Sequence, residues 1–372
     1  MSAKVSCFFY VKVFSLLVLF VTFFNVNAYS QVEQKAETDT AVTTTQEHTE
    51  GFNAGKMIMG HIGDEHDWHI IGDFTIPLPC ILYSKTKGLD VFLSSNFEPH
   101  HGEERKYNGY EMKEGKISLL DYETKEGLLT LVDVKVYDFS ITKNVLSLFV
   151  SAALLLFVFL TVARSYKTRE GKAPKGLQSW LEPLILFVRD DIAKPTLGTN
   201  YKRFMPLLLT IFFFIFFGNL LGLIPFFPGG ANLTGNIAIP FFLAIVILIV
   251  IIFIANKHYW GHIVAMPGVP KWVLIILTPI EILGFVLRPF VLMIRLFANI
   301  TAGHIIALAF YSLIFIFGAK SVAAGYGVSV VSVLFTVFMF CLDLLVAFLQ
   351  AFVFTLLSSI YFSSAIEVPE HH

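Results

Sequence analysis

Five long apolar segments follow one another from residue 145 onward, and they decide what this chain can fold into. They span residues 145–162, 205–227, 237–255, 275–317 and 328–359. About 20 apolar helical residues cross the core of a bilayer, which matches the length of the first three segments. Lipid offers the backbone no hydrogen bonds, so each segment must be helical. We therefore expect an all-α polytopic membrane domain over residues 144–372 with five transmembrane helices.

The last two segments are longer than a perpendicular crossing requires. Two long, tilted helices that follow a cylindrical partner, or helices that extend past the bilayer, would account for this length. A break at Pro279 or Pro289 is the alternative. Residues 176–198, between the first two segments, mix apolar and charged side chains and predict an amphipathic helix on the membrane surface.

The first 28 residues have the pattern of a secretory signal peptide. Lys4 and Lys12 give a basic start, residues 13–24 form a short apolar core, and residues 26–28 (VNA) resemble a cleavage site. The alternative is an uncleaved membrane anchor, although this apolar core is too short to span a bilayer well. Either interpretation places the following residues outside the cytoplasm.

A linker and a small β-containing domain are predicted before the membrane domain. Residues 29–52 are rich in Thr, Glu and Gln without periodicity, which is typical of a disordered linker. Residues 53–143 contain three segments with the β-branched and aromatic content of strands: 74–84, 89–95 and 129–141. Histidines lie among acidic residues at 61–70, but a solvated polar loop explains this pattern better than a metal site, so we expect no metal.

Lysine and arginine residues predict the orientation in the membrane. The loops at 164–203 and 257–271 are basic, whereas those at 228–236 and 318–327 carry only Lys320. Basic loops stay in the cytoplasm. We therefore expect an extracytoplasmic N-terminal domain and a cytoplasmic C-terminus.

The fourth apolar segment carries charges that are costly inside a membrane. Arg295 lies in the run IRLFANITAGH, and a charge at mid-bilayer costs about 3 to 15 kcal/mol. At about 100° per residue, one helix face collects Glu281, Arg288, Arg295 and Asn299. His304 lies about 13 Å farther along, on the opposite face. An arginine here is rarely kept unless it faces a partner, water or an ion path, so ion translocation is our leading hypothesis.

The fifth apolar segment adds Asp343 and Gln350, which share one helix face. If the last two helices pack antiparallel with Gln350 level with Arg295, then His304 and Asp343 fall at a similar depth. A His–Asp pair can exchange protons near neutral pH. A guanidinium keeps its proton and can only favour the ionised form of a nearby carboxylate. The pattern predicts two half-paths for ions, separated by a positive charge. For a single polar residue, the alternative is a structural hydrogen bond to a neighbouring helix.

Two runs resemble signature motifs of subunit a of the F-type ATP synthases, the stator subunit of their proton channel. They are RLFANITAGH at 295–304 and DLLVAFLQAFVFTLLSSIY at 343–361. The resemblance implies that Arg295 is the essential arginine of that family. It implies further proton-translocation roles for five residues: Asn299, Gln350, Glu281, His304 and Asp343. The order of histidine before acid resembles the mitochondrial type.

The resemblance also implies a location, partners and a mechanism. The N-terminal extension looks like those of some Gram-negative lineages, which implies a bacterial inner membrane. A ring of c subunits would carry carboxylates between the two half-channels, beside a peripheral stalk subunit b, the remainder of the ATP synthase and lipid. The chain would be a non-catalytic subunit, because ATP is made in a separate head. No phosphate-binding GxxxxGK loop is present, so we expect no nucleotide and no cofactor. The net charge of -1 gives no support for binding nucleic acid.

Two other functions fit a membrane protein with intramembrane charges. An independent secondary cation transporter would show inverted repeats, and the sequence contains no visible repeat. A haem-bearing electron-transfer subunit would use His304 as an axial ligand. That function needs further histidines in the membrane, and the five apolar segments contain only this one.

Overall fold

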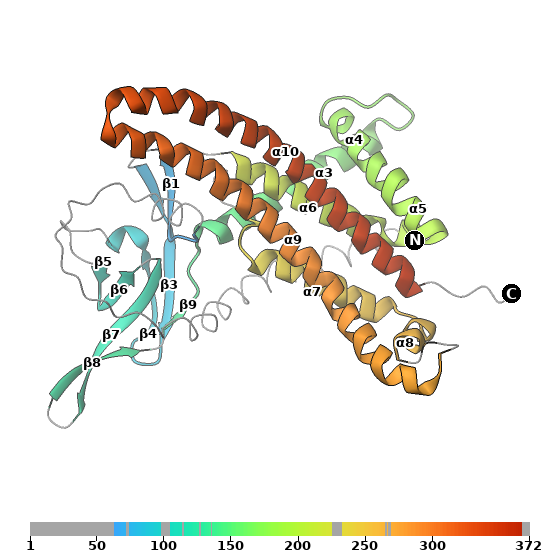
Figure 1. The fold of residues 1–372 in the computed structure, drawn as a ribbon, viewed down its shortest axis with the longest axis horizontal. Helices are drawn as coiled ribbons and strands as arrows, with labels where there is room; N and C mark the ends of the chain where they lie inside the picture. The colour runs from blue at the N-terminus through green and yellow to red at the C-terminus, as the bar shows by residue number, and fades with distance from the viewer. Residues whose placement is uncertain are drawn as a thin grey trace.

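The computed structural model describes residues 63–71, 74–97, 105–113, 115–125, 128–134, 136–224, 233–264, 266 and 269–366. The predicted signal peptide and linker, at 1–28 and 29–52, lie outside these residues. The described chain forms a small β domain at one end of a bundle of long helices (Figure 1). The expectation of a β-containing region before a mostly helical part is confirmed.

The described part of the N-terminal domain holds three antiparallel sheets. In the first, β1 (Asp67–Ile71) pairs with β2 (Phe74–Pro77). In the second, β3 (Pro79–Ser84) lies between β4 (Gly88–Leu93) and β9 (Val136–Asp138). The third has the order β5 (Arg105–Tyr107), β6 (Tyr110–Lys113), β7 (Lys116–Lys125) and β8 (Leu128–Val134). These strands include all three segments that the sequence predicts.

The core of this domain lies between the second and third sheets. Cys80 and Leu82 of β3 pack with Phe97 against Tyr110 and Leu119, and each of the five is at most 1% exposed. Successive side chains of a strand point to opposite faces. The second face of β3 therefore turns away from this core.

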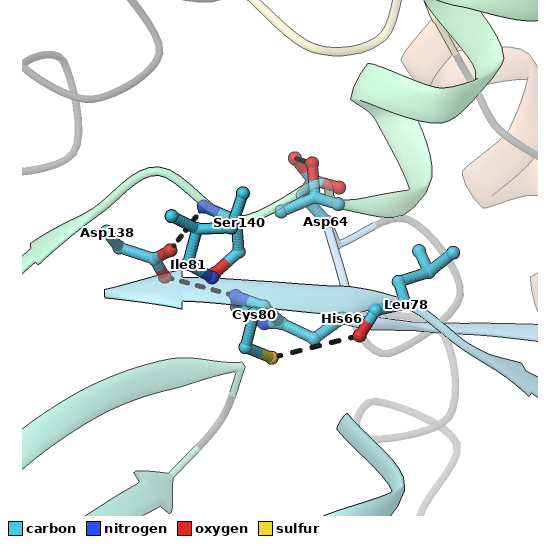
Figure 2. A network of polar contacts seen from close by, with 8 residues as sticks. Asp64, His66, Leu78, Cys80, Ile81, Asp138 and Ser140 are labelled. Carbon is cyan, nitrogen blue, oxygen red and sulfur yellow. Dashed lines mark hydrogen bonds and ion pairs between the residues drawn. The ribbon is translucent and has the colours of Figure 1, made fainter. Parts of the chain in front are cut away.

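A polar network joins the β domain to the first long helix, α3 (Lys143–Thr168) (Figure 2). Asp64 accepts hydrogen bonds from the Thr142 hydroxyl at 2.9 Å and from the backbone N–H of Asn144 at 3.1 Å. A carboxylate at this position accepts hydrogen bonds from free N–H groups and is stabilised by the positive end of the helix dipole. The first turn of α3 is thus capped by a residue from the opposite end of the domain sequence.

His66 and Asp138 form an ion pair beside this cap. The His66 Nε2 lies 3.0 Å from an Asp138 carboxylate oxygen, and His66 is only 4% exposed. Burial acts to lower the pKa of His66, but the hydrogen bond and charge of Asp138, with the charges of Asp64 and Asp67, outweigh it and raise that pKa. Burial acts to raise the pKa of Asp138, but its bonds to His66 and Ser140 outweigh it and lower that pKa.

Four short helical elements follow α3 and lead into the long helix α6 (Tyr201–Leu223). The short elements are α4 (Leu177–Phe187), the π-helical η2 (Val188–Ala193), α5 (Lys194–Leu197) and the 3-10 turn η3 (Gly198–Asn200). The predicted surface helix at 176–198 is thus helical but is not one regular α-helix. Its η2 part packs against α6 and α10, while Trp180 remains 83% exposed. The core of the helical part centres on α6, where Phe212 and Phe213 are fully buried.

The remaining helices are α7 (Ala238–Ile254), α8 (Lys257–Val264), α9 (Lys271–Lys320) and α10 (Val322–Ile366). The described residues contain four helical stretches long and apolar enough to cross a membrane, or five if α7 and α8, bent by 108°, count as one. Our expectation of five corresponds to the larger number. The described helices therefore fit a polytopic membrane protein.

The two longest helices, α9 and α10, form one antiparallel hairpin (Figure 1). α9 continues through Pro279 and Pro289, so the alternative of a break at these prolines is wrong. Its 50 residues extend about 75 Å at about 1.5 Å per residue. A bilayer core is only about 30 Å thick, so a helix of this length must tilt or extend beyond it.

Glycine brings the two helices close at the turn of this hairpin. A Cβ added to Gly325 would lie 2.8 Å from the Gly318 Cα. This contact is with backbone, which cannot rotate away as a side chain can. A few residues farther along, the rings of Phe310 and Phe335 stack with 4.7 Å between their centroids.

We expect Gly325→Ala to destabilise the protein by about 1–3 kcal/mol, because the helices must separate to accept the methyl group. Gly327→Ala is the matched control, since a Cβ there meets nothing within 4 Å. The control should be neutral or slightly stabilising, because alanine favours a helix over glycine. Thermal unfolding in lipid nanodiscs measures both, and equal midpoints would contradict the close contact.

We expect His66→Ala to lower the free energy of opening the contact between the β domain and the first turn of α3. The decrease should be about 1–3 kcal/mol near pH 6 and smaller near pH 9. The pKa of His66 is raised in the folded state. Its contribution is therefore complete below the unfolded value and is lost as the pH rises through the folded value. The pKa of Asp138 is lowered, so its contribution is complete above the unfolded value and is lost as the pH falls through the folded value.

Hydrogen exchange at the first turn of α3, corrected for the intrinsic pH dependence of exchange, measures this effect. The difference between the wild type and His66→Ala should shrink as the pH rises from about 6 to about 9. A difference that stays constant over this range would show that the histidine acts only through packing.

Candidate functional site

Two contacts fix the relative positions of α9 and α10 along their length. Gly303 of α9 faces the carboxylate of Asp343, so closely that a Cβ on this glycine would overlap it. Farther along, the Arg288 guanidinium lies 6.0 Å from the centroid of the Tyr361 ring. Because the helices run antiparallel with equal rise, residues between these two contacts must also match in depth.

Arg295 and Gln350 therefore lie at about the same depth, midway between the two contacts. Gln350 is 6% exposed and packs inside the chain. Arg295 is exposed, whereas its neighbour Leu296 is fully buried. The structure brings arginine and glutamine to one depth but does not join them, because among the described residues Arg295 makes no hydrogen bond or ion pair.

The surface around Arg295 is apolar and uncovered. Val291 and Ala298 lie one turn to either side on the same face, and both are exposed. Asn299, also one turn away, is exposed too. The hairpin thus presents an apolar face interrupted by a single cation and an amide, which no described part of the chain covers.

The histidine and the aspartate predicted to exchange protons lie close in depth. Asp343 faces Gly303, the residue immediately before His304. Both side chains are partly buried. Within the described residues they form no ion pair with each other, so the structure brings them to one level without joining them.

Glu281 lies toward the other end of α9, where it meets the short helix α8. The His262 Nδ1 of α8 is 3.9 Å from a Glu281 carboxylate oxygen. Tyr259 of α8 lies within electrostatic range of both Glu281 and Arg288. Sequence analysis missed His262 and Tyr361 as neighbours of the polar stripe. The only available signal was the basic loop at 257–271, which we used for orientation alone.

This geometry can support proton exchange at two separate places. Asp343 and His304 form one partly buried pair of titratable groups, and Glu281 with His262 forms another. Between them lies a permanent cation, because a guanidinium does not lose its proton. In the part of the chain that the structure describes, no three His, Cys, Asp or Glu residues converge as metal ligands would.

Comparison with known proteins finds one matching family model for each part of the chain. The ATP synthase A chain family matches residues 145–363, and a domain of unknown function (DUF8433) matches residues 57–139. The chain is 41% identical to ATP synthase subunit a of Chloroherpeton thalassium over 63% of its own length and 69% of that protein. It is 33% identical to ATP synthase subunit a of Chlorobium phaeobacteroides over 97% of its length and 94% of that protein. A third similar protein, ATP synthase subunit a of Myxococcus xanthus, is 38% identical over 63% of this chain and 76% of its own.

We expect Gly303→Ala to push the flexible Asp343 carboxylate out of its place, at a cost that cancels part or all of the roughly 1 kcal/mol that alanine gains over glycine in a helix. Gly318→Ala, on the same helix with nothing within 4 Å, is the control and should be neutral or stabilising. Adding Asp343→Ala to Gly303→Ala removes the overlap. Thermal unfolding of the wild type, the two single variants and the double variant should then show that the two stability changes are not additive. Simple additivity would argue that the two positions do not meet.

Proposed function

This chain belongs to the ATP synthase A chain family, as a subunit a of the F-type ATP synthases, and from that premise we propose that it moves protons against a rotor of c subunits. The observation that carries the proposal is the exposed guanidinium of Arg295. A charge in an apolar membrane segment needs a partner or water. Because the described chain offers no ion-pair partner, we infer that a carboxylate on a moving neighbour provides one.

The proposed chemistry follows from the permanent charge of the guanidinium. A carboxylate that arrives beside Arg295 is favoured in its ionised form and releases its proton. Asn299, exposed one turn away, adds an amide beside this position. Gln350 lies at the same depth but packs inside the chain, so its amide would have to turn outward to meet the carboxylate. Such amides would orient the carboxylate without adding charge, because they donate and accept hydrogen bonds but do not titrate.

We further propose two half-channels on either side of this charge. His304 lies about 13 Å from Arg295 along α9, and Glu281 lies about 21 Å away in the other direction. A proton transfers directly only over about 2.6–3.2 Å or through water. The titratable groups are therefore too far apart to exchange protons with each other, and a rotor carboxylate would have to carry each proton between them.

The proposed setting follows the orientation predicted from the basic loops. The β domain lies outside the cytoplasm, the C-terminus lies inside it, and the bilayer is a bacterial inner membrane. The partners are the c-ring, a peripheral stalk subunit b and the remainder of the synthase. The chain itself is non-catalytic, and proton flow through it turns the rotor that drives ATP synthesis elsewhere in the complex.

We expect Arg295→Ala to reduce ATP synthesis by membrane vesicles under an imposed proton gradient by at least about 100-fold, the scale of removing one key electrostatic group. Hydrolysis of ATP by the detached catalytic head should not change. Arg288→Ala is the matched control, since it removes a charge from the same helix two turns away and should lose much less synthesis. Unchanged synthesis in Arg295→Ala would refute the proposal.

A further inference from the structure

One face of the three-stranded sheet is entirely apolar. The pairing of β3 with β4 and β9, continued by the backbone hydrogen bonds of Phe139 and Ile141 to β3, places nine side chains on this face. They form three rows: Leu89–Tyr83–Tyr137, Val91–Ile81–Phe139 and Leu93–Pro79–Ile141. With strands about 4.8 Å apart and alternate residues about 6.8 Å apart, the row centres span about 10 by 14 Å. We call these nine residues the apolar face.

The charged groups of the same strands all turn the other way. Asp90 of β4 accepts a hydrogen bond from the Tyr110 hydroxyl at 2.7 Å, on the side of the domain core. Asp138 of β9 pairs with His66 on that side as well. A sheet with one face in water normally points its polar residues outward and its apolar residues inward. Here the outward face is the apolar one, which is the opposite of that arrangement.

Five of the nine side chains of the apolar face are exposed in the described chain, and the other four are half-buried. Leu89 is 64% exposed, Val91 63% and Leu93 48%. Tyr83 and Phe139 are likewise exposed. A contiguous apolar patch of this kind marks a surface for a protein or for a membrane.

The position of the apolar face favours a membrane. Ile141, in its third row, lies two residues before the first residue of α3, which is about 7 Å of extended chain. α3 itself exposes apolar residues such as Phe157, at 65%.

We propose that the apolar face rests on the surface of the bilayer that α3 crosses. Its aliphatic residues would enter the boundary between headgroups and acyl chains, as the apolar side of an interfacial element does. Tyr83 and Tyr137, whose ring centroids lie 6.4 Å apart, are the residue type enriched at this level of a membrane. Lys85, exposed in the turn after β3, would reach lipid phosphates. The short connection to α3 keeps the third row of the apolar face near the start of the membrane-crossing helix.

A photoreactive residue in the whole complex tests this contact in native membranes. Val91→p-benzoylphenylalanine places the probe in the middle row, on a side chain that is already exposed. Phe157→p-benzoylphenylalanine, on the lipid-exposed side of α3, calibrates the yield of lipid adducts. Lys116→p-benzoylphenylalanine, at the start of β7 in the other sheet, is the matched control for an exposed site on the same domain.

After illumination, mass spectrometry should find phospholipid attached at position 91 several times more often than at position 116. The proposal is overturned if position 91 captures a second copy of the chain or another subunit instead. It is also overturned if position 91 captures nothing while position 157 captures lipid, or if positions 91 and 116 capture lipid equally. None of these results would alter the proton path, because Arg295→Ala tests that path separately.

Discussion

A guanidinium that cannot lose its proton, and that has no ion-pair partner among the residues the structure describes, governs the membrane part of this protein. Arg295 sits on an apolar helix face that the rest of the described chain leaves bare. Such a charge is unfavourable in the membrane when the subunit is alone, since a partner or water has to provide a favourable environment for it. The incomplete coverage of α9 and α10 is therefore a property of a surface that a partner or lipid must complete.

Close packing elsewhere on the same hairpin makes this open face possible. Gly303 lets α10 bring Asp343 against α9, and Gly325 lets the helices meet at the turn. Gln350 is held inward at the depth of Arg295. One side of the hairpin thus sets the relative depths of the polar groups, while the other side stays exposed in the described chain.

The sequence predicted those features that depend on spacing along one helix or strand. The stripe from Glu281 to Asn299, and the shared depth of His304 and Asp343 once Gln350 is set level with Arg295, follow from the period of a helix. Three strand segments of the β domain follow from their β-branched and aromatic residues, whereas β1, β5, β6 and β7 were not predicted. The contact of His262 with Glu281 could not be predicted, because it depends on the sharp bend between α7 and α8. The π-helical stretch at Val188–Ala193 was missed for a similar reason, since local spacing does not distinguish it from an α-helix. The outward apolar face was missed because alternation along a strand shows that two faces differ but does not show which one is covered.

The cap that Asp64 provides on α3 has a consequence for the order in which the protein is made. Asp64 leaves the ribosome before Asn144, with the whole β domain between them, and the two meet only when that domain has closed. The start of the first membrane helix is therefore completed by a folded domain and not by its own sequence. Unfolding of the domain would therefore release this cap even while the apolar part of α3 stays in the membrane.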